Sequence, residues 1–128
     1  MDNGKYLKYW LEAADRDHDA MLHLYENKDY HWSLFMGHLV IEKLLKAYYV
    51  INKSDQPPYI HDLLRLAEKA ELKLTDDQMD KLDTITTFNI RARYDDYKLR
   101  FYKKCTREFT EKWINEIEEF IKWIKMML

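Results

Sequence analysis

A run from Leu34 to Ile51 constrains this chain more than any other feature, because its apolar residues lie on nearly every side of a helix. A helix that is apolar all round belongs in the centre of a fold. Three charged residues, Glu42, Lys43 and Lys46, nevertheless interrupt the run. A charge in such a place must be paired or face a cleft, since an unpaired buried charge is strongly unfavourable. The run therefore predicts a central helix that carries a polar ridge.

Turn content and periodicity both favour an all-α fold. The chain has 128 residues but two glycines and two prolines, whereas β architectures need more turn residues. We expect an up-and-down antiparallel helical bundle of four to five helices, forming one domain over residues 1–128. Thr75 and Gln78 have the spacing of a capping box, which predicts a helix start there. The other expected helices span residues 5–27, 30–52, 60–70 and 106–127.

Charge and cysteine content exclude several classes of protein. The formal net charge of −2 gives no overall attraction to nucleic acid, so such binding needs a local patch. Cys105 is the single cysteine, so we expect a free thiol, no disulfide within the chain and no cysteine zinc motif. The five histidines also lack metal-binding spacing, and we expect no metal site and no cofactor. Without a signal-peptide pattern or a long uncharged apolar stretch, the chain is expected to be cytoplasmic, with no membrane contact.

The polar ridge of the central helix is the first candidate site. Glu42 and Lys46 are four residues apart with the acid first, which is the favourable order for an ion pair. His38 lies one turn earlier on the same line. Lys43 and Lys46 could donate to a phosphate while Glu42 orients them. The alternative is an internal pair that only neutralises charge beside the core.

A basic and aromatic segment over residues 91–104 is the second candidate. It carries six basic side chains against two acidic ones, interleaved with tyrosines and a phenylalanine. Cations for phosphates and aromatic faces for bases are the ingredients of single-strand binding. Arg93 is the best individual candidate. The alternative is a solvated connector whose tyrosines pin it onto the bundle.

Histidine and aspartate residues give weaker candidates. His61 follows a proline pair at an expected helix start, where it could face an anion or exchange a proton near neutral pH. The alternative is that Asp62 caps the helix while the histidine packs under the turn. In the first helix, Asp17 could pair with Lys43 or with Arg93 across the bundle.

Four short sequence motifs, spread over nearly the whole chain, carry a family resemblance. They read Trp10-x-x-Ala13-x-x-x-Asp17, Phe35-x-x-His38-x-x-x-Glu42-Lys43-x-x-Lys46-Ala47, His61-Asp62-Leu63 and Arg93-Tyr94-Asp95. In order and spacing they resemble the HEPN domain family, the nucleotide-binding helical domain of higher eukaryotes and prokaryotes. The resemblance implies a helical bundle, usually a homodimer, that binds a nucleotide or RNA. It implies these nucleotide-binding positions: Glu42, Lys43, Lys46, His61, Arg93 and Tyr94.

The resemblance leaves three functions open. Many members accompany a small nucleotidyltransferase in bacterial toxin–antitoxin systems, which makes such a partner a candidate. Ribonuclease members carry an arginine followed four to six residues later by histidine, whereas this chain has no histidine beyond His61. Nucleotide or RNA binding is therefore the first hypothesis. The second is a metal-independent ribonuclease, with His61 or His38 as general base and Arg93 stabilising charge. The third is a protein-interaction module without a ligand.

Overall fold

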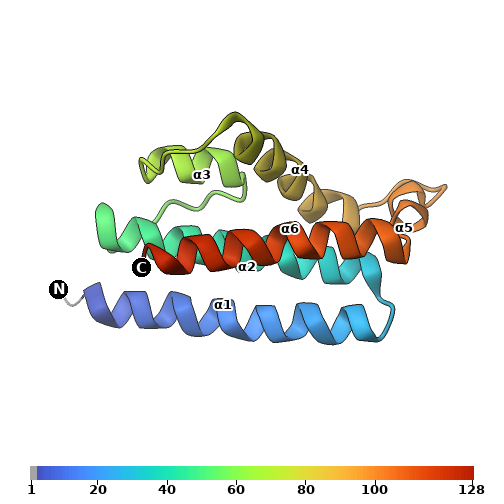
Figure 1. Cartoon of the computed structure of the whole chain (residues 1–128), viewed down its shortest axis with the longest axis horizontal. Helices are drawn as coiled ribbons and strands as arrows, with labels where there is room; N and C mark the ends of the chain where they lie inside the picture. Colours follow the sequence, from blue (N-terminus) through green and yellow to red (C-terminus); the bar gives the residue numbers. More distant parts are fainter. Residues whose placement is uncertain (1–2) are drawn as a thin grey trace.

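The helix α2, Tyr30–Asn52, is the element about which the other helices pack in this computed structural model, which describes residues 3–128 (Figure 1). It contacts α1 (Asn3–Glu26), α3 (Leu63–Lys69), α4 (Asp76–Arg93), α5 (Arg100–Lys104) and α6 (Arg107–Met126). The long helices α1, α2 and α6 lie side by side, while α3 and α4 cover one side of them (Figure 1). The expected all-α class is confirmed, and the short α5 is a helix in addition to the five that the sequence predicts. None of these helices is long and apolar enough to cross a membrane.

The core explains why α2 is central. Val40, Leu45 and Val50, which lie on different sides of α2, are all fully buried. Burial of such side chains contributes about 1.5–3 kcal/mol each relative to exposure. Gly37 lets α6 approach closely, because an added Cβ would lie 2.6 Å from Cδ1 of Ile117. Apolar side chains are thus buried on every side of α2, as the sequence pattern predicts.

Side-chain hydrogen bonds cap the first turns of α4 and α3. The expected capping box is confirmed: Thr75 Oγ1 accepts from the Gln78 N–H at 3.1 Å, and Gln78 Oε1 accepts from the Thr75 N–H at 2.9 Å. At the third helix, Asp62 Oδ1 accepts from the Arg65 N–H at 3.2 Å. Because Asp62 is the cap, α3 begins at Leu63 and not at the expected residue 60.

The segment after the expected fourth helix is more ordered than its sequence pattern indicates. The helix α4 continues to Arg93, and α5 follows after a short turn. The Asp95 carboxylate accepts from the N–H groups of Phe101 and Tyr102 at 3.1 and 2.8 Å. Desolvation alone would raise the pKa of Asp95, but these donors and nearby Arg91 outweigh it and hold the pKa below its ordinary value. The segment is fixed by Asp95 and by buried Phe101. Of its tyrosines, Tyr102 packs edge-on against the His31 ring of α2, with centroids 5.1 Å apart, whereas Tyr94 and Tyr97 are largely exposed.

Candidate functional site

Glu42 joins the ridge of α2 to the segment between α2 and α3. Its side chain is 6% exposed, and its two oxygens bind different partners. Oε2 accepts from Lys46 Nζ at 3.2 Å, which is the ion pair expected from the spacing. Oε1 accepts from His61 Nδ1 at 2.7 Å. His61 is 66% exposed, so it does not pack under the turn but stands at the surface with its Nδ1 held by a buried carboxylate.

The buried His38 imidazole lies between two other polar groups. Its Nε2 is 2.8 Å from the main-chain carbonyl of His61, and its Nδ1 is 3.3 Å from Nδ2 of Asn89. Since a carbonyl can only accept, Nε2 carries the proton and Nδ1 accepts from the amide. Burial lowers the pKa of His38, against the opposing effects of the His61 carbonyl and Glu42, so the neutral form is favoured. The neutral tautomer satisfies both contacts.

Arg93 completes this arrangement from the last turn of α4. Its Nη2 donates to Oδ1 of Asn89, and its Nε donates to the Asn89 carbonyl at 3.2 Å. The guanidinium carbon also lies 5.7 Å from the Phe35 ring centroid and 5.1 Å from that of Tyr94. Two hydrogen bonds and two aromatic contacts fix the guanidinium, although the residue is exposed. A planar fork fixed in this way is suited to phosphate oxygens.

These contacts connect six side chains into one assembly, which we call the polar network. Its middle is buried and two of its members, His61 and Arg93, are exposed. The residues that carry the two exposed groups are linked to opposite edges of the His38 ring. His61 is linked through its main-chain carbonyl, and Arg93 is linked through Asn89. The members of the polar network are Lys46, Glu42, His61, His38, Asn89 and Arg93.

Two of the residues expected to bind nucleotide lie outside the polar network. Lys43 directs its ammonium to the Asp17 carboxylate of α1, which is one of the two pairings predicted for Asp17. Tyr94 is 69% exposed and contacts the network only through Arg93. The structure therefore brings together Glu42, Lys46, His61 and Arg93 and directs Lys43 elsewhere.

The sequence pattern assigned no role to Asn89, although its position one turn before Arg93 was a usable signal for a contact between them. It also gave no role to the aromatic residues beside Lys46. The Lys46 ammonium lies 5.3 Å from the centroid of the Trp10 ring and 5.9 Å from that of the Tyr59 ring. Tyr59 is two residues from His61, but no sequence pattern predicts which way its ring points.

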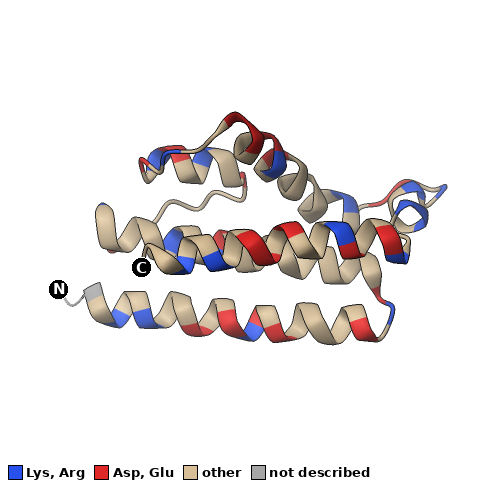
Figure 2. Cartoon of the chain, in the orientation of Figure 1, with Lys and Arg blue, Asp and Glu red and all other residues tan. Residues whose placement is uncertain are grey.

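Basic residues surround the Arg93 end of the polar network. Figure 2 shows Lys and Arg on the last turn of α4 and on α5. Arg93 itself lines a hollow of about 350 Å³ together with His31, Leu99 and Tyr102. Burial lowers the pKa of His31, against nearby Asp29 and Asp95. The positive charge of this face therefore comes from arginine and lysine near neutral pH.

Cys105 is not a candidate nucleophile. The thiol is buried, and burial raises its pKa to about 12. A thiol in this state is protonated near neutral pH. Among the described residues, no group of three or more His, Cys, Asp or Glu side chains is placed to hold a metal ion.

A comparison with protein families gives one match. The model of the HEPN domain matches residues 7–127, which is nearly the whole chain. No curated protein and no solved structure matches the chain. The matched span includes every member of the polar network.

Proposed function

Because the chain belongs to the HEPN domain family, we propose that it binds a nucleotide or RNA through phosphate, at the surface between His61 and Arg93. The observation that carries the proposal is the polar network, which fixes two exposed donor groups from buried partners. Arg93 has five N–H donors, and the contacts to Asn89 use two of them. The remaining donors, and the Nε2–H of His61 when its imidazole is protonated, are available to phosphate oxygens.

Neighbouring groups support a nucleotide over a simple anion. The Tyr94 ring is largely exposed beside the guanidinium. Stacking of a base on such a ring contributes about 1–3 kcal/mol. The basic residues of α5 extend the positive face, so a single strand of RNA could continue along it. Lys43 is not part of the proposed site, because Asp17 neutralises its ammonium.

Arg93→Ala tests this proposal by titration with AMP, GMP and a short single-stranded RNA. A hydrogen bond to a charged group contributes about 1.5–3 kcal/mol, so affinity should fall at least roughly tenfold. For AMP and GMP, the matched control is Arg100→Ala on α5, where the side chain is 68% exposed and pairs with Asp96. For RNA, loss of one phosphate contact should also reduce the salt slope by about 0.7. Equal affinities of the Arg93→Ala variant and the wild type would refute the phosphate site.

A metal-independent ribonuclease is the second candidate, and the contact between Glu42 and His61 favours it. With Nδ1–H held by the carboxylate, neutral His61 presents its Nε2 lone pair to solvent. That nitrogen could take the proton of a ribose 2′-hydroxyl, whose oxygen would attack the adjacent phosphorus as the 5′-oxygen leaves and takes a proton from water. Arg93 would stabilise the added charge. Cleavage of a labelled RNA in EDTA, lost in His61→Ala, is the expected result.

We also propose a homodimer formed at the α5 end of the bundle. Large apolar side chains are exposed there, including Trp32, Leu99 and Tyr102. Covering a group of exposed apolar side chains by a second copy of the chain is favourable. Light scattering should give twice the chain mass for the wild type, and a smaller mass for Leu99→Glu. A small nucleotidyltransferase, the partner in toxin–antitoxin systems, is a further proposal that co-purification with candidate enzymes would test.

A further inference from the structure

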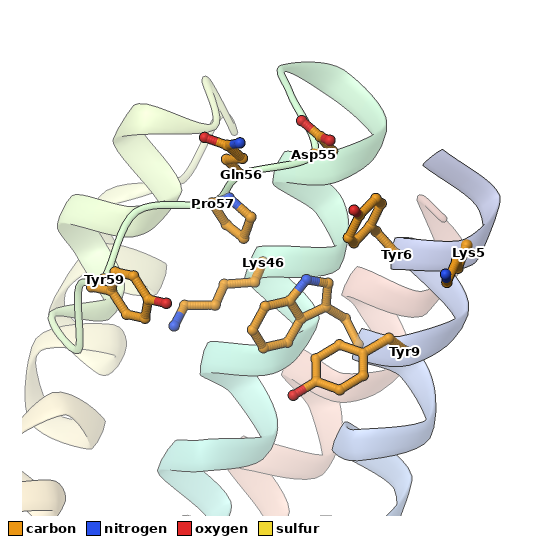
Figure 3. A pocket seen from close by; sticks show the side chains of 9 residues that line it. Lys5, Tyr6, Tyr9, Lys46, Asp55, Gln56, Pro57 and Tyr59 are labelled. Carbon is orange, nitrogen blue, oxygen red and sulfur yellow. The ribbon is translucent and has the colours of Figure 1, made fainter. Parts of the chain in front are cut away.

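A second hollow opens on the other side of the Glu42–Lys46 pair. It has a volume of about 630 Å³, within the range of small-molecule sites. Figure 3 shows the Lys46 side chain extended toward Tyr59 of the connecting segment, with Tyr6 and Tyr9 of α1 on the opposite side of the hollow. Trp10 also lines the hollow. We call this hollow the aromatic pocket.

The Lys46 ammonium has unused donors inside the aromatic pocket. The side chain is 7% exposed, and one N–H bond is directed to Glu42. Within the described part of the chain, the other two N–H bonds find no hydrogen-bond acceptor, and the Trp10 and Tyr59 rings lie near the ammonium instead. A shielded ammonium with two free donors favours a ligand with two adjacent acceptors. It also repels cations, so the rings do not form a cage for a cationic ligand.

Aromatic rings from α1 and from the connecting segment line the aromatic pocket. Tyr59 is 100% exposed, and its position after two prolines limits the freedom of the segment that carries it. The Trp10 ring is held edge-on by Tyr9, with centroids 4.9 Å apart. Exposed rings beside a shielded donor are typical of sites that stack a heteroaromatic ring.

We propose that the aromatic pocket binds a purine base, with guanine preferred over adenine. Guanine presents O6 and N7 as adjacent acceptors, which a lysine can bind together, whereas adenine places an amino donor beside N7. The inference rests on the proposed function, because the phosphate of the same nucleotide would lie toward His61 and Arg93, and Tyr94 would then stack a neighbouring base of an RNA strand. Glu42 couples the two regions, with one oxygen on His61 and the other on Lys46.

Tyr59→Ala and the fluorescence of Trp10 test this proposal. Guanosine should quench the tryptophan emission of the wild type, and the quench should be lost in Trp10→Phe but kept in Trp123→Phe, a partly buried tryptophan of α6. Because the Tyr59 ring is fully exposed, Tyr59→Ala should fold normally. We expect it to bind guanosine roughly 5- to 150-fold more weakly, the range that loss of one stacked ring gives. Tyr97→Ala, which removes an 89% exposed ring elsewhere, is the matched control.

The outcomes separate the base from the phosphate. GMP binding that is lost in Arg93→Ala but unchanged in Tyr59→Ala would leave the phosphate site standing and overturn the aromatic pocket. Guanosine binding that depends on Tyr59, without any ribose 5-phosphate binding or effect of Arg93→Ala, would support the pocket and refute the phosphate site. Equal affinity for adenosine and guanosine would overturn the guanine preference.

Discussion

His61 Nδ1 lies 2.7 Å from Oε1 of Glu42, so an exposed imidazole is oriented by a carboxylate inside the bundle. The partners come from the connecting segment and from the middle of α2, nineteen residues apart. The same carboxylate binds the Lys46 ammonium with its other oxygen. Glu42 therefore sets the positions of two groups proposed to contact ligand.

Glu42→Gln should destabilise the fold by about 3–5 kcal/mol, because it leaves the Lys46 ammonium buried without its counter-charge. Urea unfolding followed by circular dichroism measures the change. Replacing both members, with Glu42→Gln and Lys46→Met together, should recover much of the loss. Glu12→Gln is the control, since its exposed pair with Lys8 should contribute less than about 1 kcal/mol. A loss no larger than that of the control would contradict the buried pair.

His38→Gln should make the stability less dependent on pH. The pKa of His38 is lowered by burial, whereas an unfolded histidine titrates at about 6.5. Between these values the unfolded chain binds more protons, so the wild type loses stability as the pH falls through this window. The loss is at most about 1.4 kcal/mol per pH unit for one group. A glutamine can keep both hydrogen bonds without titrating.

Urea midpoints at about pH 7 and about pH 5 measure this difference. The other titrating groups are common to both proteins, so their contribution cancels in the comparison. His23→Gln, which removes an exposed histidine of α1, should leave the wild-type pH dependence unchanged. If His38→Gln destabilises the protein equally at both pH values, the buried neutral histidine is not the cause of the dependence.

Local signals in the sequence predicted the features whose partners are close along the chain. The Glu42–Lys46 pair and the Thr75 capping box follow from spacings of four and three residues. The contact between His38 and Asn89 joins residues 51 positions apart, and its geometry depends on how α2 and α4 cross. No local pattern carries that information. For the same reason the sequence left two partners open for Asp17, namely Lys43 and Arg93, and the structure pairs it with Lys43.

Thr75→Ala should destabilise the protein by about 0.5–2 kcal/mol, because the hydroxyl that accepts from the Gln78 N–H is removed. Thermal unfolding monitored by circular dichroism measures the shift. Thr87→Ala removes an exposed threonine from the interior of the same helix and should be neutral or slightly stabilising, since alanine has the higher helix propensity. Equal effects of the two substitutions would show that the cap has no special role.

The Cys105 thiol should resist modification in the folded protein. With a pKa of about 12, roughly one molecule in ten thousand carries the reactive thiolate at pH 8. A colorimetric disulfide reagent should therefore react slowly with the native chain and rapidly in concentrated guanidinium chloride. Fast reaction of the native chain, with the circular dichroism spectrum unchanged, would contradict the burial of this residue.

The hydrogen bond from His38 ends on the main chain of His61 and not on its side chain. Every amino acid supplies the same carbonyl, so the connecting segment can keep this anchor when residue 61 is exchanged. Position 61 can therefore carry different side chains while its main-chain hydrogen bond to His38 is kept. Because the side chain at this position meets the buried Glu42 carboxylate, replacements that carry a hydrogen-bond donor, such as an amide or an amine, are the ones that keep the scaffold intact.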